Sequence, residues 1–413
     1  MLRSMTIPPH IAEAVAMVNL ELRTLGLAAT AEPLYDGAQV VSLLCRTAFG
    51  VDPKRIKRLG ESLASRVGAD NCVVHREAEG LIIQLPKQER YRRALLPGEV
   101  EENMKRERRR MPVSALPLGM DMKGGTVWLD LADPRSPHVI TLGLTGSGKS
   151  TLLQWLVYRL VRQNDPGHLG LIAMSAKAKN LENLPGLPHL LHPPVHDLLE
   201  IQQVMAWLMN EVQRRNASMV ARPAIVLMVD EVHYLVDQDE GIAKQLDQIA
   251  KIGREVGVHL LAGSQRGDQG SVGNLIYNVP VRAVGQLGSA TYNWSTTGKA
   301  GSGADELLGK GDFVLTGRGR GIVRFQAPML RSRDWGRLPR SHQRRLDLPH
   351  PVALTPKPVT PTATDLSDDD LMEMAEAFQE GASIRSVMRD WKIGYDRAKQ
   401  IQEIVLEEVS IEQ

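Results

Sequence analysis

The sequence has 413 residues, of which 43% are hydrophobic and 24% are charged, and its formal net charge is +2. This length predicts two or three domains, and the composition excludes a disordered, collagen-like or membrane-embedded chain. No apolar run approaches the roughly 20 residues of a membrane-spanning helix, and the first residues lack a secretory signal pattern, so we expect a cytoplasmic protein. The balance of 50 basic and 48 acidic residues excludes a histone-like polycation, so any affinity for nucleic acids must be local.

The two cysteines, Cys45 and Cys72, lack the grouped spacing of a metal or redox site, which predicts buried free thiols.

Residues 1–103 predict a small α+β domain. Apolar residues at three- and four-residue spacing predict an amphipathic helix over 7–27. Residues 38–47 predict a strand and residues 71–86 predict a pair of strands joined by a tight turn, with a helix over 53–67 between them.

Residues 104–340 predict a second domain, which opens with a basic connector. The apolar runs HVITLGL, LGLIAM, AIVLMVD and VHLLAGSQ are each followed by a helical pattern. This alternation predicts an α/β domain with a largely parallel sheet and helices on both of its faces. The domain is expected to end in a glycine-rich hairpin, FVLTGRGRGIVRF.

The remaining residues predict a tethered helical module. Residues 341–364 are rich in proline and predict a stiff linker, and residues 365–413 predict helices throughout. A helix capped by Ser383, a turn at 392–394 and a third helix from Tyr395 form a helix-turn-helix pattern, typical of major-groove readers. A three-helix module that binds another protein is the alternative interpretation. The candidate DNA-contacting residues are Arg389, Lys392, Tyr395, Arg397 and Lys399.

A glycine-rich segment in the second domain predicts a phosphate-binding loop. Residues 143–150, GLTGSGKS, fit the pattern G-x-x-x-x-G-K-[ST], with an apolar strand before them and a helix after them. In such a loop the backbone N–H groups and the helix N-terminus face the phosphates. Lys149 is expected to reach the β- and γ-phosphates and Ser150 to ligate Mg²⁺, whereas a purely structural turn is the alternative. The candidate nucleotide-binding residues are Gly143, Leu144, Thr145, Gly146, Ser147, Gly148, Lys149, Ser150 and Thr151.

An acidic pair indicates hydrolysis in addition to binding. The apolar run 224–229 delivers Asp230 and Glu231 at its carboxyl end, where ligand sites of α/β sheets lie. We expect Asp230 to hold the Mg²⁺ shell and Glu231 to orient and polarise the attacking water. Strands commonly end in acidic residues, but the phosphate loop earlier in the chain favours the catalytic interpretation.

Three further residues are candidates for sensing or completing the site. Gln265 follows the next apolar run and is expected to report nucleotide state, with a strand-end cap as the alternative. Arg254 and Arg282 flank that run, and an arginine supplied by a neighbouring subunit stabilises the charge that develops during phosphoryl transfer. Each arginine is equally well explained as a solvated surface residue.

Several motifs together resemble the FtsK/SpoIIIE DNA translocases, within the wider FtsK-HerA class of ring motors. PHVITLGLTGSGKS is similar to the family's entry into its phosphate loop, and GREVGVHLLAGSQR, NVPVRAVGQ and ADELLGKGDFVL resemble its later motor motifs in the same order. Residues 40–87 resemble the family's small alpha domain, and residues 383–400 resemble its C-terminal winged-helix, or gamma, domain. The sequence departs from the family pattern at residues 175–177, Ser-Ala-Lys, where Asp-Pro-Lys is usual.

The resemblance implies a RecA-like motor and an ATP-driven translocase of double-stranded DNA. The implied assembly is a homo-hexameric ring, with ATP and Mg²⁺ as cofactors, DNA in its bore and the helix-turn-helix module reading a short site. A conjugation or mobile-element coupling ATPase is one alternative, and it would need a separate membrane or recombination partner because we expect no membrane span in this chain. An FtsK-like protein-export ATPase and a DNA-binding regulator with a vestigial motor are the others.

Overall fold

The computed structural model divides the chain into two compact units, Met1–Pro349 and His350–Gln413. In the first unit it describes residues 7–47, 53–67, 72–77, 80–108, 110–267, 269–289, 292–299, 302–317, 321–342 and 344–349. In the second unit it describes residues 373, 374, 377, 378, 383, 386 and 387. Apart from residues 383, 386 and 387, the predicted helix-turn-helix lies outside the described residues, as do its five candidate DNA-contacting residues, and both remain a prediction.

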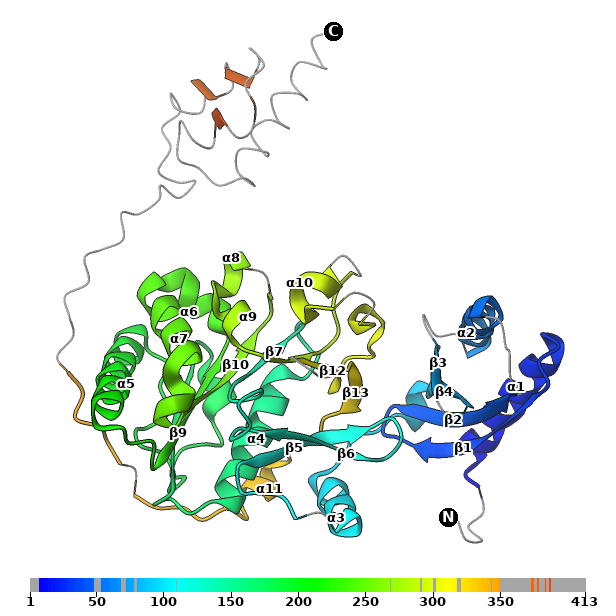
Figure 1. The fold of residues 1–413 in the computed structure, drawn as a ribbon, viewed down its shortest axis with the longest axis horizontal. Helices are drawn as coiled ribbons and strands as arrows, with labels where there is room; N and C mark the ends of the chain where they lie inside the picture. Colours follow the sequence, from blue (N-terminus) through cyan, green and yellow to red (C-terminus); the bar gives the residue numbers. More distant parts are fainter. Residues whose placement is uncertain are drawn as a thin grey trace. The chain divides into compact units, whose positions relative to one another are not determined.

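The N-terminal part of the first unit is a four-stranded antiparallel sheet with two helices (Figure 1). Its elements are α1 (Pro9–Thr24), β1 (Ala29–Asp36), β2 (Val40–Thr47), α2 (Pro53–Val67), β3 (Val73–Glu77) and β4 (Gly80–Pro86). The strand order is β1-β2-β4-β3. Val18 and Leu22 of α1 and Leu59 and Leu63 of α2 share one buried core with the strands, so both helices cover the same face. Hydrophobic burial on that face is what holds this small sheet together.

The larger sheet has nine strands in the order β6-β5-β13-β12-β11-β7-β10-β9-β8. Its strands are β5 (Ala115–Asp121), β6 (Thr126–Asp130), β7 (Val139–Leu142), β8 (Leu169–Ser175), β9 (Ala224–Asp230), β10 (Val258–Ser264), β11 (Val281–Val284), β12 (Asp312–Gly317) and β13 (Val323–Gln326). The pairings from β8 through β9, β10 and β7 to β11 are parallel. The pairings from β11 through β12, β13 and β5 to β6 are antiparallel. The expectation of a largely parallel sheet is thus correct for one half and wrong for the other.

Helices cover both faces of the large sheet, as the alternation of strands and helices predicts. Its helices are α3 (Pro97–Glu107), α4 (Lys149–Gln163), α5 (Leu198–Ser218), α6 (Val232–Gln238), α7 (Glu240–Ile252), α8 (Gln269–Val272), α9 (Leu275–Asn278), α10 (Asn293–Thr297) and α11 (Ser332–Trp335). Short 3-10 helices lie at Glu89–Tyr91, Ala178–Leu181, Gly253–Val256 and Ala304–Glu306. Figure 1 shows α5, α6 and α7 side by side.

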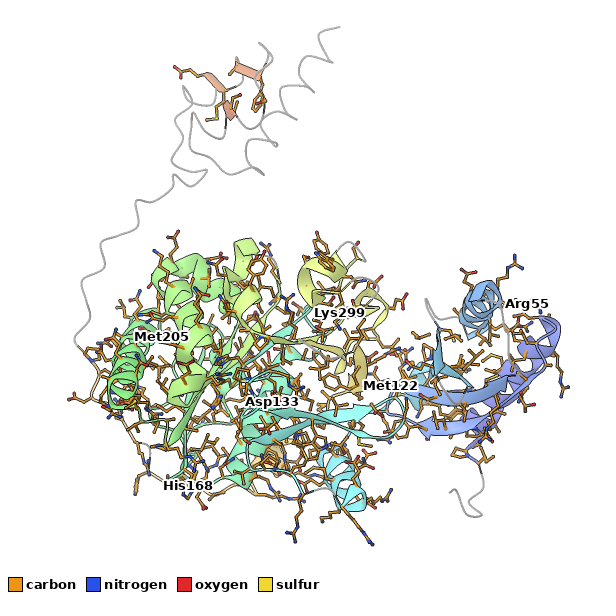
Figure 2. The ribbon with its side chains drawn as sticks, viewed as in Figure 1. Arg55, Met122, Asp133, His168, Met205 and Lys299 are labelled. Carbon is orange, nitrogen blue, oxygen red and sulfur yellow. The ribbon has the colours of Figure 1, made fainter. Side chains whose placement is uncertain are left out.

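Alternate residues of the central strands enter two separate cores, one on each face. On β9, Val226 and Met228 pack in the core that contains α4, whereas Leu227 and Val229 pack in the core of α5 and α7. Met205 of α5, labelled in Figure 2, is fully buried in the second core. A strand buried on both faces has no polar alternation, which is why AIVLMVD is continuously apolar.

The main disagreements with the sequence analysis are strands that it does not predict. These are β1, which carries a register shift after Pro33, and the hairpin of β5 and β6, which carries another after Pro117. In addition, the first half of the expected basic connector, residues 104–107, belongs to α3. Among the described residues, no helix is long and apolar enough to cross a membrane.

Candidate functional site

The candidate site lies at one edge of the large sheet, where four parallel strands end. The final residue of β10, Ser264, pairs with Leu142 of β7, and the final residues of β8 and β9, Ser175 and Asp230, pair with each other. The segments that follow these strands therefore emerge next to one another. This carboxyl edge is where open α/β sheets bind ligands.

The phosphate loop joins β7 to α4, and its shape depends on glycine. Gly148 has a φ of 104°, and a Cβ at this position would lie 2.8 Å from the backbone nitrogen of Gly311. Helix α4 begins at Lys149, so the partial positive charge of its N-terminus faces the loop. The Nζ atom of Lys149 donates to the carbonyl oxygen of Leu144 at 2.9 Å. Burial lowers the pKa of Lys149, and the charges of Glu231 and Asp230 oppose that shift.

Asp230 and Ser150 lie close together beside this loop. Asp230 is fully buried, and burial raises its pKa. Its Oδ2 atom accepts from Nδ2 of Asn180 at 2.8 Å, and the same nitrogen lies 3.4 Å from Oγ of Ser150. A carboxylate and a hydroxyl that share one donor are oxygen ligands facing a common point. This donor set fits Mg²⁺, which prefers carboxylate, water and phosphate oxygens.

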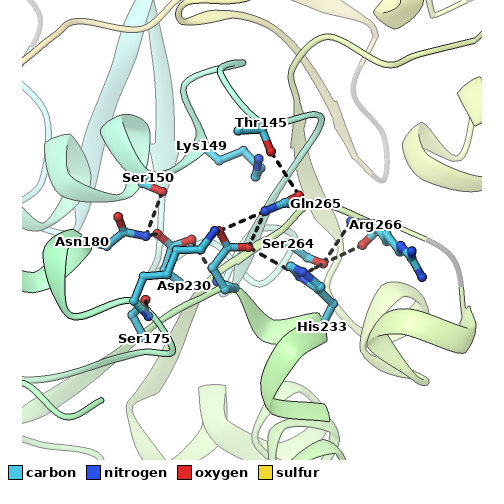
Figure 3. A network of polar contacts seen from close by, with 12 residues as sticks. Thr145, Lys149, Ser150, Ser175, Asn180, Asp230, His233, Ser264, Gln265 and Arg266 are labelled. Atoms are coloured by element: carbon cyan, nitrogen blue, oxygen red, sulfur yellow. Dashed lines mark hydrogen bonds and ion pairs between the residues drawn. The ribbon is translucent and has the colours of Figure 1, made fainter. Parts of the chain in front are cut away.

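Glu231 is held by two donors from neighbouring strand ends (Figure 3). Nζ of Lys177 lies 2.5 Å from its Oε1, and Nε2 of Gln265 lies 3.1 Å from each of its carboxylate oxygens. Thr145 of the phosphate loop donates to Oε1 of Gln265 at 3.2 Å. Burial raises the pKa of Glu231, but the hydrogen bonds from Lys177 and Gln265 outweigh it and the net pKa is lowered. Gln265 thus connects the phosphate loop to Glu231 directly.

A cavity of about 710 Å³ runs along the loop and has two differently built ends. We call the first the phosphate end, and it is lined by Lys149, Ser150, Lys177, Asn180, Glu231 and Gln265. We call the second the connector end, and it is lined by Gln39, Glu89, Arg92, Arg93, Ala94, Leu95, Lys310, Gly311, Gln326, Ala327 and Met329. The connector end includes the segment that leads from the N-terminal sheet into α3.

The connector end is tied to the phosphate loop through the turn at residues 309–311. The backbone N–H groups of Lys310 and Gly311 donate to the carbonyl oxygens of Gly146 and Ser147. On its other side the turn contacts Gln39, whose Nε2 lies 3.0 Å from the oxygen of Gly309 and 3.1 Å from that of Lys310. A continuous chain of hydrogen bonds therefore joins the N-terminal sheet to the phosphate loop.

The two candidate arginines have different surroundings. Arg282 points into its own chain, where its guanidinium donates to the carbonyl oxygens of Ile276 at 2.6 Å and Thr296 at 3.1 Å. Burial lowers its pKa. Arg254 is exposed in the 3-10 helix Gly253–Val256. Of the two, Arg254 is the one whose side chain is accessible to another subunit.

The sequence analysis does not identify Lys177 or Asn180 as site residues. Both follow the end of β8, and the backbone N–H of Lys177 donates to Oγ of Ser175 at 3.1 Å. The sequence feature that could have identified both residues is their position, because they follow an apolar strand just as Glu231 and Gln265 do. Lys177 also keeps the lysine of the family's Asp-Pro-Lys triplet, but neither signal predicts a contact with the phosphate loop or the acidic pair.

A protein-family model matches the part of the chain that holds the phosphate loop and Asp230. Residues 99–230 match the model of the FtsK/SpoIIIE family. The chain carries an FtsK/SpoIIIE domain. The matched region contains the phosphate loop and ends at Asp230, which confirms the family resemblance of the chain up to that residue.

Curated relatives of the FtsK/SpoIIIE domain include proteins named as DNA translocases. SftA from Bacillus subtilis is 25% identical over 425 residues, which cover 95% of this chain and 43% of the relative. FtsK from Borreliella burgdorferi is 25% identical over 417 residues, covering 90% of this chain and 51% of the relative. The chain thus spans about half the length of these relatives.

A solved structure shares the fold of the FtsK/SpoIIIE domain. It is the cytoplasmic domain of the type VII secretion ATPase EccC from Thermomonospora curvata, which is 25% identical with a TM-score of 0.50. The match covers 57% of this chain and 33% of that one. The large sheet and its helices are therefore a P-loop ATPase fold of the RecA-like type, as expected.

Proposed function

We propose that this chain is an ATP-driven translocase of double-stranded DNA. The observation that carries the proposal is the phosphate end, where Lys149, Glu231 and Gln265 line one cavity beside the buried carboxylate of Asp230. The FtsK/SpoIIIE domain and the relatives named as DNA translocases support DNA as the substrate. The N-terminal sheet and the C-terminal residues are proposed to be the family's alpha domain and DNA-reading module.

The residues of the phosphate end have separate roles in this proposal. The loop backbone, the start of α4 and Lys149 bind the β- and γ-phosphates. Glu231 orients and polarises the attacking water, since its carboxylate lies beside the loop and its lowered pKa keeps it ionised. Gln265 contacts both Thr145 and Glu231, so a shift of the loop on nucleotide binding is transmitted to Glu231. This contact is the physical basis of its role as a sensor.

ATP and Mg²⁺ are the proposed cofactors. Ser150 and Asp230 would hold the metal, with Asn180 turning away from their oxygens. When bound, Mg²⁺ neutralises charge on the β- and γ-phosphate oxygens.

A homo-hexameric ring is the proposed assembly, with each ATP site next to a neighbouring subunit. Arg254 is the proposed arginine supplied to that neighbour, because its side chain is exposed whereas that of Arg282 is bonded within its own chain. A guanidinium supplied in this way stabilises the charge of phosphoryl transfer and makes hydrolysis depend on ring formation.

DNA-stimulated hydrolysis and triplex displacement test the proposal. We expect linear duplex to stimulate ATP hydrolysis and the protein to displace a third strand, with both activities lost in the Glu231→Gln variant. Lys179→Ala, which removes an exposed lysine outside the cavity, is the matched control and should retain both. An ATP hydrolysis rate that does not change when duplex DNA is added, in a protein that stays monomeric at every concentration, would contradict the proposal.

Protein export is the second candidate function. The shared fold with a secretion ATPase is the observation that favours it. An ATPase that responds to a polypeptide substrate but not to duplex DNA would support export over DNA translocation.

A further inference from the structure

Lys177 is the residue of the phosphate end whose role is not explained by the loop or the acidic pair. Its side chain is 56% exposed, and it reaches into the cavity to pair with Glu231, which is 7% exposed. The backbone of Lys177 is fixed by its bond to Ser175, a fully buried residue at the end of β8. Only the flexible side chain is therefore free to change its contact.

The hydrogen-bond donors around Glu231 compete with the water that its proposed role requires. Both carboxylate oxygens accept from Gln265, and one also pairs with Lys177 at 2.5 Å. A carboxylate must accept a hydrogen bond from the attacking water in order to polarise it. The ammonium group of Lys177 at 2.5 Å occupies an oxygen that already accepts from Gln265. Lys177 and Gln265 thus both contact Oε1 of Glu231, and withdrawal of Lys177 would free that oxygen for water.

A phosphate group is an anion that could replace Glu231 as the partner of Lys177. The phosphate end is lined by two lysines, Lys149 and Lys177. In the proposed function the γ-phosphate of ATP would add negative charge at this end, and ADP lacks that phosphate. Lysine is a flexible point charge, so it exchanges one anionic partner for another more easily than arginine does.

We propose that Lys177 is a second phosphate-binding lysine, and that Glu231 and the γ-phosphate of ATP compete for its ammonium group. Binding of ATP then draws Lys177 away and leaves an oxygen of Glu231 for water. ADP does not compete, so Glu231 stays paired. The inference rests on the proposed ATPase function, and it adds a switch that distinguishes the two nucleotides.

Binding of ADP and of a non-hydrolysable ATP analogue to the full chain tests the competition. Because a hydrogen bond to a charged group is worth about 1.5–3 kcal/mol, we expect Lys177→Ala to weaken analogue binding about tenfold or more. Binding of ADP should be unchanged, and Lys177→Arg should restore most of the loss. Lys179→Ala, the same change two residues away on an exposed site, should alter neither ligand.

A double-mutant cycle gives the sharper result. Glu231→Gln removes the competing anion, so it should tighten analogue binding in the wild-type background and have no such effect when Lys177 is alanine. Equal losses for ADP and the analogue, or purely additive effects of the two changes, would overturn the inference. If the wild-type chain binds neither nucleotide, the proposed function itself fails. If the Lys177 variants bind both nucleotides as tightly as the wild type does, only this inference is overturned.

Discussion

The two ends of the nucleotide cavity are assembled in different ways. The phosphate end takes its residues from the segments that follow β7, β8, β9 and β10, which are adjacent parallel strands. The connector end brings Gln39 to Gly309 across 270 positions of the sequence, using an antiparallel half-sheet and the N-terminal sheet. The first end depends on local strand order, whereas the second depends on how distant segments pack. We therefore expect changes at the phosphate end to affect chemistry and changes at the connector end to affect stability.

The largest effect on chemistry is expected from Lys149→Ala at the phosphate end. Loss of a preorganised cation should lower kcat for ATP hydrolysis about 100- to 1000-fold. The variant should fold as stably as the wild type. Lys149 is buried, and burying its charged ammonium group costs free energy that the alanine variant does not lose. Hydrolysis rates and thermal unfolding, measured on the same samples, check both statements. A large fall in the melting temperature would remove the distinction between the two ends.

The largest effect on stability is expected from Arg324→Met on β13. Arg324 makes two contacts with Asp312, at 2.6 and 3.0 Å, and Asp312 is fully buried. Its remaining amino group donates to Gln84 of β4, which joins the two sheets. Removing one partner of a buried ion pair leaves an uncompensated charge and should cost about 3–5 kcal/mol of unfolding free energy.

Denaturant unfolding measures this cost, and an exposed arginine supplies the control. Arg46 pairs with Glu32 at the surface of the N-terminal sheet, with both side chains more than half exposed. Arg46→Met should leave the unfolding midpoint nearly unchanged. Similar midpoints for the two variants would mean that the Arg324 pair contributes no more than a surface pair.

A smaller effect is expected from Gln39→Ala at the connector end. Gln39 is buried, and its amide contacts the oxygens of Gly309 and Lys310 and Oε1 of Gln326. Leaving these acceptors without a donor should cost about 1–3 kcal/mol of unfolding free energy. Because the turn supports the phosphate loop, the KM for ATP should also rise while kcat changes little. Gln88→Ala, at an exposed position of the connector, is the control, and an equal effect from it would contradict this account.

The sequence predicts the phosphate end better than the connector end for a physical reason. A phosphate loop and an acidic pair each follow an apolar run, so the position of Lys149 and Glu231 near each other follows from parallel strand order. Lys177 keeps the lysine of the family's Asp-Pro-Lys triplet, but a lysine after a strand does not by itself predict a contact with Glu231. Gln39 escapes it because its partners are set by tertiary packing.

The same reasoning explains the fold. The helix at 53–67 is predicted with its observed bounds, since its pattern is local. Strands β1 and β5 each contain a proline and a register shift, which interrupt the alternation that reveals a strand. The antiparallel half of the large sheet is consequently the part that sequence patterns do not predict.

The smallest expected effect uses the two cysteines as probes of the N-terminal sheet. Both are buried free thiols, and burial raises the pKa of Cys45 to about 11 and that of Cys72 to about 12. The thiolate is the reactive form, so maleimide labelling at neutral pH should be slow and should require local opening of this sheet. If the connector end couples the sheet to the cavity, a saturating ATP analogue should slow labelling several-fold, because a ligand that binds the closed form opposes opening. Gln39→Ala should reduce this protection by removing the contact between β2 and the turn at residues 309–311. Protection that persists unchanged in that variant would show that the N-terminal sheet responds to nucleotide by a route other than Gln39. The contrast between the two ends of the cavity would then be weaker than their different strand origins imply.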